Sequence, residues 1–445
     1  MWTVAQLAAD LAAGRTSSRR LAEQALGRIA DPAGEGARAF IKVYAESALA
    51  EADFSDRLRK AGVRRSPVDG LPVSLKDLFD VAGDVTRAGS RIFEKNPPAK
   101  ADAPVVARLR AAGAVFVGRT NMVEFAFGGV GLNPHYGTPK NPYDRKTGRV
   151  PGGSSCGAAV AQADGMCVMA LGSDTRGSVR GPAALCGVVG FKPTARRVPR
   201  EGVFPLSTTL DSVGPLANSV ACCAAYDAVL SGEPGSPADL PTKGLRLMSP
   251  RSSVLRDLDA EVEKAFHAAL EKLSRAGAVV SEVAVAAFDR QSEYFKSGGY
   301  AGAESYSIHR PWLGRIGEYD PRVAKRVLLG KDFPAADYLE LGQLRAAYIR
   351  EVEALSAPFD AIVMPAVPCI APTLADAGRT DEDYFRWNDR INRNSGLVNF
   401  LDGCGVTLPC HEPGAAPVGF LVCGPALSDR RILAVAAAVE RAIRQ

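Results

Sequence analysis

The chain has 445 residues, of which 47% are hydrophobic and 23% are charged, and its formal net charge is +5. This composition is that of an ordinary globular protein, and so small a charge indicates neither a nucleic-acid partner nor a membrane surface. No apolar segment approaches the ~20 residues that span a bilayer, and the first residues lack the pattern of a secretory signal.

Nine cysteines are scattered along the chain, and no pair has C-x-x-C spacing. Such a distribution is typical of buried reduced thiols and not of a zinc or redox site. We therefore expect no metal site and a cytoplasmic protein.

The first part of the chain begins with predicted helices and reaches a short buried strand. Apolar residues at helical spacing predict helices near residues 3–13, 18–29 and 43–62. A turn is expected at Asp69-Gly70, so that Pro72 to Leu75 form a strand. Lys76 follows at the end of this strand, where α/β folds tend to place chemistry.

Two serine- and glycine-rich turns then flank one apolar run. A helix at 105–112 and a strand at 114–118 are followed by a long loop to Pro151. Gly152-Gly153-Ser154-Ser155 precedes the apolar residues 166–171, and Gly172 to Pro182 follows them. A core strand between two loops can hold their side chains at a fixed separation, as paired catalytic groups require.

The second half continues an alternation of strands and helices. Strands are predicted near residues 245–248, 278–283, 361–365, 406–409 and 418–423, and helices near 217–230, 257–276, 335–355 and 427–443. This alternation predicts an α/β sheet with helices on both faces. Residues 285–335 show the least pattern, and we expect an insertion near the active site there.

The serine-rich stretch allows three interpretations. In the first, its residues only form turns, and Ser154 or Ser155 caps a helix. In the second, Gly153 to Gly157 match the G-x-S-x-G motif of Ser-His-acid hydrolases, with Ser155 as nucleophile. This motif needs a hydrophobic strand before it, which Lys146 to Pro151 cannot form, and none of the four histidines has a convincing context.

In the third interpretation, Lys76 is the base for a catalytic serine. A serine hydroxyl attacks an amide carbonyl only when its proton is removed, and a neutral lysine can accept that proton. Neutrality at pH 7 requires the lysine pKa to fall from ~10.4 to about 7, which burial can cause. The strand ending at Leu75 offers such a setting, but Lys76 could equally be a surface lysine paired with Asp77 or Asp80.

Three ordered motifs resemble those of the amidase signature family, the Ser-Ser-Lys hydrolases. Leu71 to Asp77 resembles the lysine segment, Gly152 to Ser155 the first serine segment, and Gly172 to Arg180 the nucleophile segment. A weaker likeness extends over nearly the whole chain. It implies one α/β domain over residues 1–445 with a central mixed sheet, whose core signature region spans about 65–200.

The resemblance also implies the roles of the catalytic residues. Ser178 would be the nucleophile, and Ser154, joined to Gly153 by a cis peptide bond, would be the bridging serine. Lys76 would be the base that acts through Ser154. No metal or cofactor is implied.

The same resemblance implies how the carbonyl of the substrate is held. The backbone N–H groups expected to face the oxyanion are those of Thr175, Arg176, Gly177 and Ser178. Phe127 and Gly128 belong to the loop beside the substrate. Arg176 stands where the family usually has glycine; it could point to solvent, bind a nearby acid, or recognise a carboxylate or a polar acyl group of the substrate.

We therefore expect an amidase that converts a small-molecule amide to acid and ammonia or amine through an acyl-enzyme. An alternative is the glutaminase (A) subunit of a tRNA-dependent amidotransferase, which needs a partner subunit; residues 121–142 have some of that character. A non-catalytic binding protein on the same scaffold is a third hypothesis. The resemblance also implies a possible homodimer, since family members are commonly dimers, and the sequence does not identify the amide.

Overall fold

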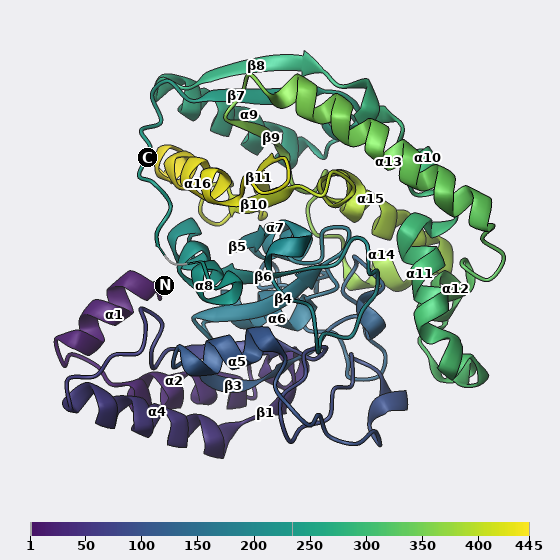
Figure 1. The fold of residues 1–445 in the computed structure, drawn as a ribbon. Helices are drawn as coiled ribbons and strands as arrows, with labels where there is room; N and C mark the ends of the chain where they lie inside the picture. Colours follow the sequence, from purple (N-terminus) through teal and green to yellow (C-terminus); the bar gives the residue numbers. More distant parts are fainter. Residues whose placement is uncertain (1, 234, 445) are drawn as a thin grey trace.

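One mixed sheet of eleven strands runs through the described residues, 2–233 and 235–444, of this computed structural model (Figure 1). The strand order is β1-β3-β2-β4-β6-β5-β10-β11-β9-β7-β8. In chain order the strands are β1 (Phe40–Val43), β2 (Pro72–Lys76), β3 (Val115–Thr120), β4 (Met169–Asp174), β5 (Val189–Lys192), β6 (Ser212–Ala217), β7 (Arg246–Arg251), β8 (Val279–Ala284), β9 (Ala361–Pro365), β10 (Cys404–Pro409) and β11 (Gly419–Gly424).

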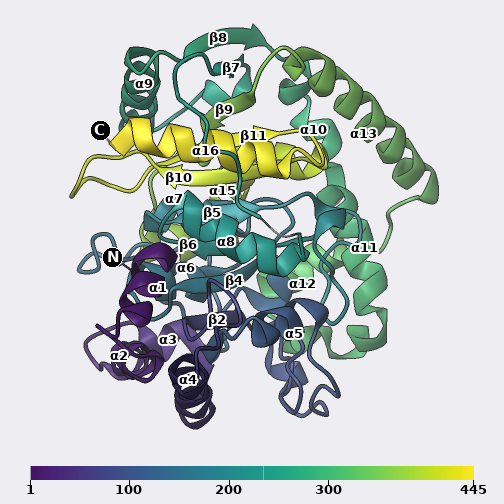
Figure 2. The ribbon, with the colours of Figure 1, turned by 60° about the vertical axis from the view of Figure 1, so that its left-hand side comes forward.

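Helices cover both faces of this sheet (Figures 1 and 2). The α-helices are α1 (Val4–Ala12), α2 (Ser18–Ala30), α3 (Gly36–Ala39), α4 (Ala45–Lys60), α5 (Pro104–Ala111), α6 (Cys156–Ala163), α7 (Arg180–Cys186), α8 (Val220–Ser231), α9 (Ala260–Arg275), α10 (Gln291–Tyr294), α11 (Gly299–His309), α12 (Pro321–Leu328), α13 (Ala335–Ser356), α14 (Leu374–Gly378), α15 (Asp381–Phe400) and α16 (Asp429–Arg444). Helices α5, α8, α16 and α9 contact one another in a row on one face, and α6, α7 and α15 do so on the other.

The predicted fold class, one α/β domain with a central mixed sheet and helices on both faces, is confirmed. None of the described helices has the length and apolar character that crossing a membrane requires.

Three neighbouring parallel strands position the candidate site. β2 lies between β3 and β4 and runs parallel to both, and every residue of the three strands is buried. Lys76 pairs with Thr120 of β3, and Leu75 pairs with Leu171 of β4. The carboxyl ends of the three strands therefore meet at one edge, which is where open α/β sheets bind ligands.

The segment 285–335 is helical and lies along one flank of the sheet (Figure 1). It contains α10, α11 and α12, together with the 3-10 helices η5 (Ala286–Asp289), η6 (Lys296–Gly298) and η7 (Arg310–Glu318). Helix α12 packs against α11 and η7. Ala301 and Arg326 of this segment line the same pocket as Ser178.

Candidate active site

Lys76 lies at the carboxyl end of β2 and contacts two serine hydroxyls. Its Nζ donates to Ser154 Oγ at 2.8 Å and to Ser173 Oγ at 2.9 Å. Lys76 and Ser154 are fully buried. The register explains the second contact: Leu75 pairs with Leu171, so Ser173 lies just beyond the end of the β2–β4 pairing.

Burial governs the charge of this lysine. It lowers the pKa of Lys76 to about 7, which the more distant Cys156, Asp174 and Asp211 only partly oppose. The alternative of a surface lysine paired with Asp77 is wrong, because Asp77 is paired with the Arg119 guanidinium at 2.6 Å. The Lys76 amine therefore loses its proton far more readily than an ordinary lysine does.

The segment around Ser154 is hydrogen-bonded to the stretch that follows β3. The Gly153–Ser154 peptide bond is cis. Gly153 N–H donates to the Gly129 carbonyl at 2.7 Å, and the Ser154 carbonyl accepts from Val123 N–H at 3.0 Å. Ser155 occupies the N-cap position of α6, as one interpretation expected, but its side chain makes no capping hydrogen bond.

A buried carboxylate organises the loop that carries Ser178. Asp174 accepts hydrogen bonds from the Arg180 guanidinium at 2.9 and 3.0 Å and from the Asn399 amide at 2.9 Å. These partners hold the pKa of Asp174 well below its usual range, although burial opposes them. Ser178 follows in this loop, and its carbonyl accepts from Ser155 N–H at 3.3 Å.

Among the described residues, three of the four backbone N–H groups expected to face the oxyanion are free. Gly177 N–H was expected to face the oxyanion, but it donates to Asp174 Oδ1 at 2.8 Å, because the loop turns around that carboxylate. Gly177 has φ +124°, which a residue with a side chain rarely adopts. Within the described part of the chain, the N–H groups of Thr175, Arg176 and Ser178 have no hydrogen-bond acceptor and remain available.

A narrow pocket at Ser178 adjoins a larger cavity. A narrow pocket, with room for about 10 Å³, is lined by Ala126, Phe127, Gly128, Thr175, Arg176, Ser178, Leu206, Ala301, Arg326 and Asn392. A larger cavity of about 520 Å³ shares Ala126, Thr175 and Leu206 with it and extends past Asp211. Thr175 Oγ1 donates to Asp211 at 2.6 Å, and this hydrogen bond holds Thr175 at the boundary between the pocket and the cavity.

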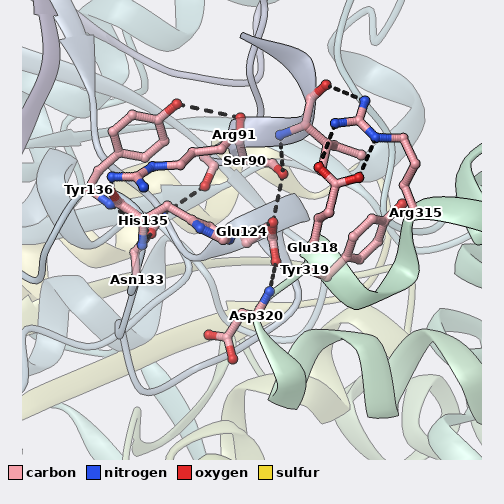
Figure 3. Close-up of polar contacts among 12 residues, drawn as sticks. Ser90, Arg91, Glu124, Asn133, His135, Tyr136, Arg315, Glu318, Tyr319 and Asp320 are labelled. Carbon is pink, nitrogen blue, oxygen red and sulfur yellow. Dashed lines mark hydrogen bonds and ion pairs between the residues drawn. The ribbon is translucent and has the colours of Figure 1, made fainter.

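A polar cluster connects the loop that contains Phe127 and Gly128, here called the pocket loop, to the helical segment 285–335 (Figure 3). Glu124 is fully buried and accepts from Ser90 Oγ at 2.6 Å and from the backbone N–H of Asp320 at 2.6 Å. His135 Nε2 lies 2.8 Å from the same carboxylate. Asp320 is the N-cap of α12, so Glu124 connects the loop beside Ser178 to the helix that carries Arg326.

The Ser-His-acid interpretation is wrong. His135 contacts Glu124, His309 contacts Tyr319, and His411 accepts from Val418 N–H. No histidine of residues 2–233 and 235–444 makes a hydrogen bond to Ser154, Ser155 or Ser178. In the same residues, no group of three or more His, Cys, Asp and Glu side chains is arranged to hold a metal ion.

Ser173, Asp211, Arg326 and Asn392 were not singled out from the sequence. Ser173 was within reach, because it lies on the strand that pairs with β2. Asp211, Arg326 and Asn392 come from distant parts of the chain, and no local pattern marks them.

Known proteins resemble this chain over most of its length. The sequence pattern of the family described as Amidase matches residues 20–433. A 2-amino-5-chloromuconic acid deaminase from Comamonas testosteroni is 37% identical over 400 residues, which cover 88% of this chain and 85% of that protein. The A subunit of the glutamyl-tRNA(Gln) amidotransferase from Chromohalobacter salexigens is 34% identical over 470 residues, which cover 98% of this chain and 95% of that protein. A crystal structure of an amidase superposes with a TM-score of 0.88 at 32% identity, over 99% of both chains.

The fold and these similarities define a hydrolase that acts on carbon–nitrogen bonds. The chain belongs to the amidase family, as its three motifs indicated.

Proposed function

We propose that the protein hydrolyses a small-molecule carboxylic amide through a Lys76–Ser154–Ser178 relay and an acyl-enzyme. The observation that carries this proposal is the fully buried contact of 2.8 Å between Lys76 Nζ and Ser154 Oγ. A neutral amine at this position accepts the Ser154 proton while Ser154 accepts the proton of Ser178.

Ser178 Oγ then forms a bond to the carbonyl carbon of the amide. The negative charge that develops on the carbonyl oxygen faces the free N–H groups of Thr175, Arg176 and Ser178. Preorganised donors of this kind stabilise a transition state by ~3–4 kcal/mol each.

The C–N bond breaks as the relay returns its proton to the leaving nitrogen, which departs as ammonia or amine. A water molecule then attacks the ester of Ser178 and gives its proton to the same relay. The acid leaves, and Ser178 regains its hydroxyl.

A fluorophosphonate probe tests this assignment, because it reacts with activated serines. We expect mass spectrometry to place the label on Ser178, and Lys76→Ala to slow labelling by at least tenfold. Labelling of Ser155 instead, or no labelling of a folded protein that releases ammonia from amides, would contradict the proposal. A non-catalytic binding protein would neither be labelled nor release ammonia.

A second candidate is the glutaminase (A) subunit of a tRNA-dependent amidotransferase. It is favoured by the likeness to the corresponding glutamyl-tRNA(Gln) amidotransferase chain over 98% of this chain. Such a role requires a partner subunit. Co-purification of a partner, with glutaminase activity that depends on tRNA, would favour this function over that of an independent amidase.

We further propose a cytoplasmic location and no nucleic-acid partner for an independent amidase. All nine cysteines are unpaired and buried, which suits a reducing compartment. A homodimer is part of the same proposal, and sedimentation at micromolar concentration tests it.

A further inference from the structure

Two arginines from distant parts of the chain face the same narrow pocket as Ser178. Arg176 belongs to the loop that precedes the serine, and Arg326 belongs to α12 in the helical segment. Each guanidinium lies over an aromatic ring: that of Arg176 is 3.9 Å from the centre of the Phe295 ring, and that of Arg326 is 4.3 Å from the centre of the Phe127 ring.

Neither arginine has a carboxylate partner within 4.0 Å among the residues that the structure describes. Arg326 is only 8% exposed, and its Nη1 donates to the neutral amide of Asn388 at 2.8 Å. The Nε atom of Arg176 is inaccessible and has no hydrogen-bond acceptor. No acid among the described residues is therefore bound to Arg176, and its side chain is only partly exposed.

Two fully buried arginines of the same protein do have carboxylate partners. Arg119 is paired with Asp77 at 2.6 Å, and Arg180 is paired with Asp174 at 2.9 Å, with all four side chains fully buried. A buried cation without a counter-charge is costly, so it needs a reason. Here the reason lies in the pocket that both unpaired guanidiniums line.

The surrounding charges do not neutralise Arg176 and Arg326. Burial lowers the pKa of Arg176 to about 10, Asp389 opposes this change, and the charge of Arg326 reinforces it. Burial likewise lowers the pKa of Arg326, against Tyr384 and Asp389. Asp389 is exposed and, in the part of the chain that the structure describes, forms no ion pair within 4.0 Å with either guanidinium. Both arginines therefore remain cationic at neutral pH and repel each other until an anion joins them.

We propose that the acyl half of the substrate carries a carboxylate, which Arg176 and Arg326 bind together beside Ser178. This inference rests on the proposed amide hydrolysis and names its substrate class: short monoamides of dicarboxylic acids. A guanidinium presents parallel N–H donors that match a carboxylate, and a shared anion removes the repulsion between the two cations. Both arginines line the narrow pocket beside Ser178, which has room for about 10 Å³ and must widen to admit a carboxylate, and the cavity of about 520 Å³ adjoins it at Thr175.

The test compares amides of equal length with and without a carboxylate. Ammonia release is measured from succinamate against butyramide and from malonamate against propionamide, for the wild type and for Arg176→Gln, Arg176→Lys and Arg326→Gln. We expect the wild type to prefer the carboxylated amide, and the ratio of the two kcat/KM values to fall roughly 30-fold or more in each Gln variant. Arg176→Lys should recover part of the ratio. Arg310→Gln, which removes an exposed charge from the same helical segment, should leave the ratio unchanged.

Two results would overturn the inference. One is a wild type that hydrolyses butyramide as well as succinamate. The other is an Arg176→Gln variant in which both substrates lose the same factor, as expected if the guanidinium acted on the oxyanion and not on a carboxylate.

A binding measurement separates this inference from the proposed function. Calorimetric titration with succinate should show binding to the wild type and at least 30-fold weaker binding to Arg176→Gln. Arginine-dependent succinate binding without ammonia release from any amide would contradict amide hydrolysis but keep the carboxylate site. Hydrolysis of amides without arginine-dependent succinate binding would overturn the carboxylate site alone.

Discussion

The lysine–serine relay and the wall of the narrow pocket are built in opposite ways. Lys76 and Ser173 are carried by adjacent core strands, and Ser154 lies in a segment whose backbone is bonded on both sides. The pocket wall instead combines Arg176 from a loop with Arg326 from a short helix of the 285–335 segment. Lys76 and Ser154 of the relay are hydrogen-bonded to each other, whereas the guanidiniums of Arg176 and Arg326 have no carboxylate partner among the described residues.

This difference indicates a division of labour. Proton transfer needs groups held within hydrogen-bond distance, and adjacent parallel strands supply that rigidity. Selectivity needs a complementary charge that only the substrate completes, and such a charge can be placed on elements outside the sheet. Variants of the relay should therefore affect kcat, and variants of the wall and its supports should affect KM.

The largest effect is expected from Ser178→Ala. Loss of the nucleophile should lower kcat by about 10⁴- to 10⁶-fold, because only binding and oxyanion contacts remain. The thermal midpoint should stay within a few degrees of the wild type, since Ser178 contributes its backbone carbonyl and not its side chain to the hydrogen bond with Ser155. Ammonia release and circular dichroism measure the two effects.

Ser155→Ala is the matched control for the neighbouring serine. Its hydroxyl makes only a 3.4 Å hydrogen bond to the Ser173 carbonyl, so a loss of less than tenfold is expected. A loss as large as that of Ser178→Ala would move the nucleophile to Ser155.

Lys76→Met should have the next largest effect, a fall of ~10²- to 10⁴-fold in kcat/KM, because the general base is lost while the buried volume is kept. In the wild type, kcat/KM should decrease about tenfold per pH unit below about pH 7, where Lys76 becomes protonated. The pH–rate profile of the variant should lack this acidic limb. A loss below tenfold would remove Lys76 from the mechanism.

Stability gives an independent check on the same lysine. The unfolded chain keeps Lys76 charged up to ~pH 10, while the folded state releases its proton near pH 7. The unfolded state thus binds more protons between these values, so the free energy of unfolding should rise with pH in this window. Urea titrations of Lys76→Met should show less of this rise, and an equal rise in both proteins would mean that Lys76 is charged in the fold.

The sequence predicted the strands around Lys76 better than the pocket beside them. Strands near 72–75, 114–118 and 361–365 were placed within a few residues, because continuous apolar runs of this length are typical of central strands. β6 was missed, since Ser212, Gly214 and Pro215 interrupt its apolar pattern, although all six of its residues are buried. The strand expected at 166–171 begins at Met169 and extends to Asp174, which brings Ser173 onto the sheet.

The pocket could not be predicted from local patterns. Helix α15 was not expected, because its many charged and polar residues obscure the helical pattern of its sequence. One face of this helix nevertheless places Asn392 in the pocket lining and Asn399 against Asp174. Arg326 looks like an ordinary surface cation in the sequence, and only the packing of α12 brings it beside Ser178. Such contacts depend on tertiary structure, in which residues far apart in the sequence meet.

Ser173→Ala should have a moderate effect on the relay. Removal of the hydroxyl at 2.9 Å from Lys76 Nζ should lower kcat by about tenfold, because one hydrogen bond that orients the amine is lost. Hydrogen bonds to a charged group are the stronger ones, so the loss disfavours the protonated amine, and the acidic limb of the pH–rate profile should move to lower pH. Ser74→Ala, on the same strand as Lys76 but in contact with Cys167, should leave the limb unchanged. An unshifted limb in Ser173→Ala would reduce Ser173 to a packing role.

The smallest effect is expected from Glu124→Gln, which weakens the tie between the pocket loop and α12. The amide replaces one carboxylate oxygen by a donor, so one of the hydrogen bonds to Ser90, His135 or Asp320 N–H is lost. Since α12 carries Arg326, KM for the preferred amide should rise about threefold to tenfold, the equivalent of one hydrogen bond, with kcat within twofold. Glu318→Gln, which breaks an exposed pair with Arg315 in the same segment, is the control and should change neither constant. A lower thermal midpoint without any change in KM would show that Glu124 only supports the fold. A fall in kcat would show that the pocket wall also affects the relay, and would contradict the separation of kcat effects from KM effects.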